Sequence, residues 1–241
     1  MIEIKDIVTL AAYIGAALSV GFGAIGAGIG IGQTGAEACA SISRQPKAQG
    51  TIFKSMLIGQ AVVESAAIFG LVIAILLIFG NVASDNICMA FAFIGAGISM
   101  GFGAISGGLG AGYTSAKTCK ELGKRPDITT TLIGNMLIGQ AASQTPSIFA
   151  LVIAMLLVFI KADTVSIVRM AALLGAGISM GFGAIGPGIG SGITSGFACE
   201  GMGRDTKNIN LLMRTMLVGQ AVSQSTAIYA MIISFLLMYL V

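Results

Sequence analysis

The chain has 241 residues, of which 56% are hydrophobic and only 10% are charged, and its mean hydropathy is +0.95. Soluble globular domains contain about 25% charged residues, so this composition indicates a membrane protein. The small net charge of +3 argues against a nucleic-acid-binding surface, and the absence of histidine argues against histidine-ligated metal sites and histidine acid–base catalysis.

Six apolar runs follow one another along the chain, and each is longer than the roughly 20 residues that a membrane-spanning helix needs. They occupy residues 7–36, 55–84, 86–116, 128–160, 170–199 and 215–241. A closed barrel would instead contain alternating strands of about 10 residues, whereas helices satisfy their backbone hydrogen bonds within each run. We therefore predict an all-α membrane protein with six transmembrane helices.

The same sequence features return every 80 residues. The motif GFGAI begins at Gly21, Gly101 and Gly181, and the motif GQA begins at Gly59, Gly139 and Gly219. This period predicts three tandem helical hairpins. We name them hairpin 1 (residues 1–82), hairpin 2 (83–162) and hairpin 3 (163–241). Because the GQA glutamine occurs in all three, we expect it to pack or form hydrogen bonds rather than act as a ligand.

The charged residues predict how the hairpins face the membrane. Ten of the thirteen basic residues lie in or beside three loops, near residues 43–54, 120–127 and 203–214. Since positive residues favour the cytoplasmic side, we expect these loops in the cytoplasm and both termini outside, in a multi-pass protein of the cell membrane. Glu37 and Glu200 lie towards the cytoplasmic helix ends, where we expect solvated faces.

Glycine is dense in the first helix of every hairpin. One stretch, GFGAIG at 21–26, fits a dinucleotide-binding fingerprint, but that fingerprint follows a strand, and this stretch lies inside a long apolar helix. Small residues instead let membrane helices approach closely. We therefore expect the odd-numbered helices to form a tightly packed inner ring, with the even-numbered helices outside. Ordinary packing in a compact six-helix bundle is the alternative.

One carboxylate, Glu64, interrupts the second apolar run. A charge at mid-membrane costs about 2.5–3.5 kcal/mol on insertion scales, so Glu64 is a candidate functional residue, with a protonated structural glutamate as the alternative. Gln33 on the preceding helix is expected at a similar depth, and a carboxylate with an amide oxygen suits a hard monovalent cation. Hairpins 2 and 3 carry Gln144 and Gln224 where hairpin 1 carries Glu64.

Together these features resemble the rotor-ring c subunit of F-type ATP synthases. The resemblance is carried by the glycine-rich helices, the loop RQP at 44–46, the motif GQAVVES at 59–65, and Gln33. It is closest to the sodium-binding branch and extends over the whole chain, three times. It implies a ring of hairpins in which two neighbours share each cation site. One neighbour supplies a glutamine and a glutamate, and the other supplies a backbone carbonyl and the hydroxyls of serine, threonine and tyrosine.

Hairpin 1 matches only the first half of this family pattern. It has Gln33, Glu64 and Ser65, but Ala66 and Phe69 replace the threonine and the tyrosine of the family. The resemblance therefore implies that hairpin 1 carries the ion but needs supporting hydroxyls from elsewhere.

The other two hairpins differ from each other. Hairpin 2 has lost the pattern, because Gln144 replaces the glutamate and Pro146 replaces the threonine. Hairpin 3 lacks the glutamine and the glutamate but keeps the neighbour half of the pattern in Ser225, Thr226 and Tyr229.

The two half-patterns imply an ion site at the junction between two chains. Its expected ligands are Gln33, Glu64, the Val222 carbonyl, Ser225, Thr226 and Tyr229. A competing arrangement takes hairpin 2 as the neighbour, with the Ala142 carbonyl and Thr145, but it lacks the tyrosine hydroxyl. Val62 and Ser65 are further alternative neighbour ligands.

The resemblance implies a non-catalytic rotor-ring component of a rotary ATP synthase or ATPase, which carries Na+ or H+ on Glu64 and needs no cofactor. Expected partners are copies of the chain, with or without other c subunits, a stator protein with an essential arginine, central-stalk proteins at the cytoplasmic loops, and membrane lipid. One carboxylate for three hairpins favours ion pumping or a mixed ring. A self-contained six-helix cation channel or transporter and a structural proteolipid are the alternatives.

Overall fold

The computed structural model describes residues 3–80, 84–161 and 165–240. The described residues form six long helices, which are α1 (Ile4–Arg44), α2 (Gln49–Phe79), α3 (Cys88–Leu122), α4 (Thr129–Phe159), α5 (Ile167–Arg204) and α6 (Ile209–Tyr239). All six are long and apolar enough to span a membrane, so the predicted all-α fold with six transmembrane helices is confirmed. The hairpin boundaries expected at 82/83 and 162/163 lie outside the described residues.

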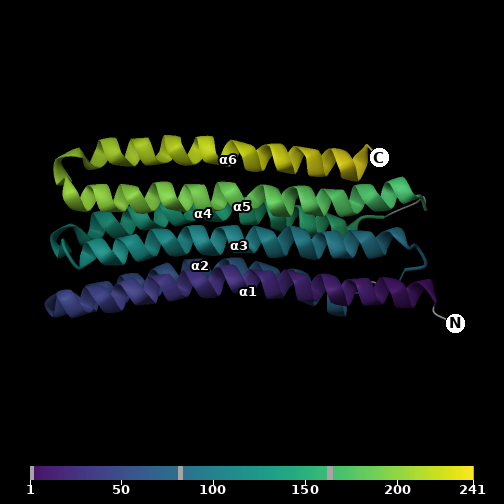
Figure 1. Cartoon of the computed structure of the whole chain (residues 1–241), viewed down its shortest axis with the longest axis horizontal. Coiled ribbons are helices and arrows are strands. Elements are labelled where there is room, and N and C mark those ends of the chain that lie inside the picture. Colours follow the sequence, from purple (N-terminus) through teal and green to yellow (C-terminus); the bar gives the residue numbers. More distant parts are fainter. Residues whose placement is uncertain (1–2, 81–83, 162–164, 241) are drawn as a thin grey trace.

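The helices form three hairpins that stand side by side in the same orientation (Figure 1). Helices α1, α3 and α5 form one layer, in which each packs against the next, and α2 and α4 lie behind this layer. The three hairpin turns lie at one end of the molecule, and the start of α1 and the end of α6 lie at the other. The hairpins are therefore parallel repeats.

The turns are shorter than the sequence indicated. Only Gln45 and the 3₁₀ turn η1 (Pro46–Ala48) separate α1 from α2, so helix replaces most of the loop predicted at 43–54. The turns η2 (Pro126–Ile128) and η3 (Thr206–Asn208) make the equivalent connections in hairpins 2 and 3. The charged residues that end each apolar run do not end the helix, because lysine, arginine and glutamate are good helix formers.

Very close backbone contacts join the helices of the first layer. A Cβ atom at Gly97 on α3 would lie 2.2 Å from the carbonyl oxygen of Gly15 on α1. One at Gly177 on α5 would lie 2.2 Å from the carbonyl oxygen of Gly95 on α3. Neither position can hold a larger residue without moving the helices apart. The predicted role of small residues in close helix packing is therefore confirmed.

Contacts between hairpins repeat with the sequence period. The phenyl rings of Phe22, Phe102 and Phe182 stack in a row, and both steps have a centroid distance of 4.5 Å. Thr34 on α1 shares a hydrogen bond with Ser115 on α3, and the equivalent pair recurs between α3 and α5. Hairpin 3 therefore sits on hairpin 2 as hairpin 2 sits on hairpin 1. The same relation indicates how a second copy of the chain would extend the row.

Candidate functional site

Glu64 lies at the midpoint of α2, on the outer edge of hairpin 1. Its side chain is exposed, and it has no hydrogen-bond or ion-pair partner among residues 3–80, 84–161 and 165–240. The helix carries no other charged residue beyond Lys54 near its start. Its repeat equivalent Gln144 reaches back to Val62 of the preceding hairpin, so the repeat indicates that Glu64 faces the open end of the row, where a neighbouring chain would pack.

The backbone of Gln33 lies nearer the hairpin turn than the backbone of Glu64. Val63 on α2 packs against Gly30 on α1, and Ala67 lies beside Gly23, so Glu64 is level with the segment 23–30. At a rise of 1.5 Å per residue, Gln33 is at least about 4.5 Å nearer the hairpin turn.

Gln33 also faces a different helix. It lines a cavity of about 240 Å³ between α1 and α3, together with Glu37, Tyr113 and Lys117. No hydrogen bond joins the Gln33 and Glu64 side chains among the described residues, and the role of Gln33 as a ligand stays a prediction of the family pattern.

Hairpin 3 presents the expected neighbour half on the exposed face of α6. The Ser225 hydroxyl donates to the Val222 carbonyl oxygen at 2.8 Å, so these two groups form one carbonyl–hydroxyl pair. Val222 is 67% exposed and Tyr229 is 63% exposed. Thr226 is exposed as well, but its hydroxyl donates to the Ser223 carbonyl at 3.1 Å. Both hydroxyls thus donate within α6, and Val222, Thr226 and Tyr229 are exposed on a face that a neighbouring chain could cover.

The same carbonyl–hydroxyl pair exists in hairpin 1, where it already has a partner. The Ser65 hydroxyl donates to the Val62 carbonyl at 2.7 Å, and the Gln144 side-chain amide on α4 donates to the same carbonyl at 2.9 Å. At the next interface, the Gln224 amide on α6 donates to the Ala142 carbonyl at 2.8 Å.

These two contacts follow one rule. The residue at the glutamate position of one hairpin reaches the carbonyl two residues before that position in the preceding hairpin. Within the chain, the alternative neighbour carbonyls of Val62 and Ala142 are therefore occupied by amides. The Thr145 hydroxyl donates within its own helix to the Ala141 carbonyl, at 3.3 Å.

All three glutamines of the GQA motif form hydrogen bonds; Gln60 donates within its own hairpin to the Ile31 carbonyl, whereas the other two also join neighbouring hairpins. The Gln140 amide donates to the Gly59 carbonyl on α2 and to the Ala111 carbonyl on α3, each at 3.1 Å. Gln220 makes the equivalent two bonds from hairpin 3. The prediction that these glutamines form hydrogen bonds is confirmed.

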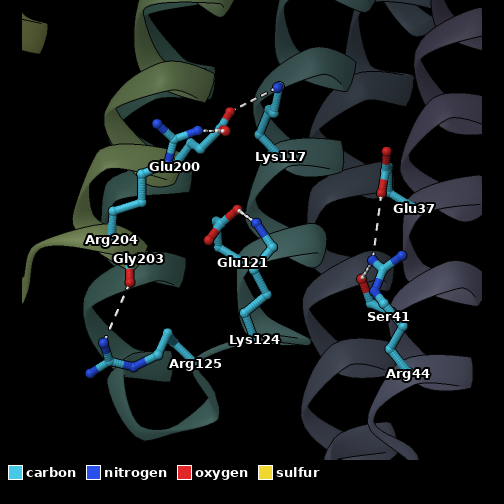
Figure 2. A network of polar contacts seen from close by, with 10 residues as sticks. All are labelled: Glu37, Ser41, Arg44, Lys117, Glu121, Lys124, Arg125, Glu200, Gly203 and Arg204. Carbon is cyan, nitrogen blue, oxygen red and sulfur yellow. Dashed lines mark hydrogen bonds and ion pairs between the residues drawn. The ribbon is translucent and has the colours of Figure 1, made fainter.

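A network of ion pairs lies at the end of the molecule that carries the turns (Figure 2). Glu200 on α5 bonds to Lys117 on α3, at 2.9 Å between Nζ and Oε2, and to Arg204 on its own helix. Glu200 is only 8% exposed, so the prediction of a solvated face there is wrong. Glu121 is buried too and pairs with Lys124. The sequence feature that indicates this network is a pair of opposite charges near the same helix end of successive hairpins, Lys117 in hairpin 2 and Glu200 in hairpin 3.

Between α3 and α4, a charged pair lies at the turn of hairpin 2. The Arg125 guanidinium makes two bonds to the Asp127 carboxylate, at 3.0 and 2.7 Å. These bonds lower the pKa of that carboxyl below its usual range.

Comparisons with known proteins agree with the threefold repeat. The family model for the C subunit of ATP synthase matches residues 14–77, 94–157 and 174–237. The chain is 28% identical to the K subunit of the A-type ATP synthase of Methanocaldococcus jannaschii, over 95% of this chain and 96% of that protein.

Single-hairpin proteins match as well. The chain is 48% identical to the ATP synthase c subunit of Natranaerobius thermophilus, over 34% of this chain and 93% of that protein. It is 49% identical to that of Microcystis aeruginosa, over 31% of this chain and 91% of that protein. With three family units in tandem covering most of its length, the chain belongs to the family of ATP synthase C subunits.

Proposed function

We propose that this rotor-ring component of a rotary ATPase carries one cation per chain, bound by Glu64 at the junction between two copies. The observation that carries the proposal is the repeated contact between the glutamate position of one hairpin and a carbonyl of the hairpin before it. If hairpin 3 of a neighbouring chain packs before hairpin 1 in the same way, the equivalent contact joins Glu64 to the Val222 carbonyl of that chain. The Ser225 hydroxyl already lies 2.8 Å from that carbonyl.

The available ligands favour Na+ over a bare proton. A carboxylate, a backbone carbonyl and hydroxyl oxygens are the hard oxygen donors that suit an alkali cation, whereas a proton needs only the acid. Tyr229, which is exposed on the same face of α6, would hold the carboxylate from the side of the neighbouring chain. Thr226 would reach the site through a bound water molecule.

The proposed cycle follows from the cost of charge in the membrane. The loaded carboxylate is neutral and can face lipid, whereas the empty one cannot. Rotation against a stator would then carry each ion between two access pathways, and a stator arginine would release it. No lysine or arginine lies in the middle of any of the six helices, so this positive charge has to come from a partner.

One carboxylate per chain also fixes the ion-to-rotation ratio. Moving one charge through 100 mV yields about 2.3 kcal/mol, so a ring with fewer carriers collects less work per turn and can build a steeper gradient per ATP hydrolysed. We therefore favour ion pumping, or a ring shared with other c subunits. Basic residues at the turns favour a cytoplasmic position for the turns, where the central stalk would bind.

Carbodiimide labelling of the intact ring tests this function. The reagent modifies protonated carboxyls in apolar surroundings, so labelling should occur at Glu64 and should slow markedly when Na+ is added. Labelling that Na+ does not slow would favour H+ as the ion. Absence of label at Glu64, or cation conduction by the purified chain alone in vesicles, would contradict the proposal and favour a self-contained channel.

A further inference from the structure

Two side-chain amides occupy the interfaces inside the chain at the position where the chain junction has Glu64. We call the contacts Gln144–Val62 and Gln224–Ala142 the amide bridges; their lengths are 2.9 and 2.8 Å. Gln144 is only 5% exposed, and its side-chain oxygen is buried beside Gly107 without a hydrogen-bond partner among the described residues. The bond to the Val62 carbonyl orients the amide group, with its nitrogen directed at that carbonyl.

The second bridge satisfies a carbonyl that the sequence leaves without a helical partner. Pro146 lies inside α4, four residues after Ala142. Proline has no backbone N–H, so the Ala142 carbonyl loses the bond that residue 146 normally donates. In a membrane such a freed carbonyl has to be satisfied by a neighbouring helix, and the Gln224 amide on α6 provides this bond.

An amide reproduces the loaded form of a carboxylate. A carboxylate presents a cation or a proton to the facing carbonyl only when it is occupied, whereas the amide presents an N–H group at all times. We propose that Gln144 and Gln224 are permanent substitutes for the ion-loaded glutamate, which keep the two interfaces inside the chain closed whatever the ion concentration. Exchange is then confined to the chain junction. This inference rests on the proposed role of Glu64 as the ion carrier.

The surroundings of the first bridge contain few charges that could disturb it. Helices α2, α3, α5 and α6 pack against α4, and on them Glu64 is the one charged residue at this depth among the described residues. Their other charges lie towards the helix ends, namely at Lys54, Lys117, Lys120, Glu121, Arg169, Glu200, Arg204 and Arg214. A carboxylate introduced at position 144 would therefore respond to pH and Na+ with Glu64 as its principal charged neighbour.

Melting of the purified intact ring, measured across pH and Na+ concentration, tests the inference. The wild-type ring should become more stable with Na+ or at low pH. The Glu64→Gln ring has an amide at every interface and should lose this dependence. Adding Gln144→Glu to Glu64→Gln should restore the dependence, whereas adding Gln144→Leu should lower the melting temperature equally under all conditions. If the melting temperature of the ring with both Glu64→Gln and Gln144→Glu did not depend on pH or Na+, the inference would be overturned.

The proline provides a second and independent test. Gln224→Leu should lower the melting temperature of the ring strongly, because the Ala142 carbonyl then has no partner. In a Pro146→Ala ring the helix can satisfy that carbonyl again, so Gln224→Leu should cost clearly less there. Equal losses in the two backgrounds would contradict the inference. Failure of the proposed function would be recognised separately, as absence of carbodiimide label at Glu64 in the wild-type ring.

Discussion

Substitution of one exposed glycine tests whether chains join as hairpins do. Nothing lies within 4 Å of a Cβ atom placed at Gly32 on α1. Its repeat equivalents are crowded, because a Cβ at Gly112 would lie 2.2 Å from the Gly30 Cα, and one at Gly192 would lie 2.2 Å from the Gly110 carbonyl oxygen. If a neighbouring chain continues the row, Gly32 meets its Gly190 in the same way.

Gly32→Ala should therefore block ring assembly without harming the fold of the single chain. Ordinary contact begins near 3.4 Å, so the two backbones would have to separate by about 1.2 Å. Overpacking of this kind costs about 1–3 kcal/mol, and here it recurs at every junction of the ring. The expected result in detergent is a helical, monodisperse single chain with a much smaller fraction of rings.

Gly134→Ala is the matched control. Gly134 also has nothing within 4 Å, and its repeat equivalents are Lys54 and Arg214, so this position tolerates large side chains in the other hairpins. Ring yield and single-chain helicity are measured by native mass spectrometry and circular dichroism. A Gly32→Ala chain that forms rings as well as the Gly134→Ala chain would refute the reasoning.

Three further predictions concern single polar groups. Tyr229→Phe should weaken Na+ binding about three- to tenfold in titrations of the ring, the range expected for one membrane hydrogen bond; unchanged affinity would remove the tyrosine from the site. Lys117→Met should lower the melting temperature more than Lys117→Met combined with Glu200→Gln, because the single change leaves a buried carboxylate short of a partner. Asp127 should titrate below its usual pKa by NMR, return towards it in Arg125→Gln, and contribute stability that is lost as pH falls through the lowered pKa.

The six helices and their repeat could be predicted from sequence because length, hydropathy and period determine them. The burial of Glu200 could not, since its partner Lys117 lies 83 residues away in another hairpin. The register between α1 and α2 could not be predicted either, because it is set by the short turn of hairpin 1 and by the packing of Val63 against Gly30.

The hydrogen bonds around the glutamate position could not be predicted from the sequence either. The sequence contains Gln144 and Gln224 as plain substitutions, and nothing in either hairpin alone identifies their acceptors. Their bonds to Val62 and Ala142 depend on the offset between neighbouring hairpins, which the close glycine contacts establish. The relation between Pro146 and Gln224 is likewise visible only once α4 and α6 lie side by side.

The number of bound cations per ring tests the central claim most directly. A high-resolution map of the ring in Na+ should contain one ion density per chain, at the junction between Glu64 of one copy and Val222 of its neighbour. The interfaces that hold Gln144 and Gln224 should contain none. An ion at every hairpin, or an ion between two hairpins of the same chain, would contradict the account.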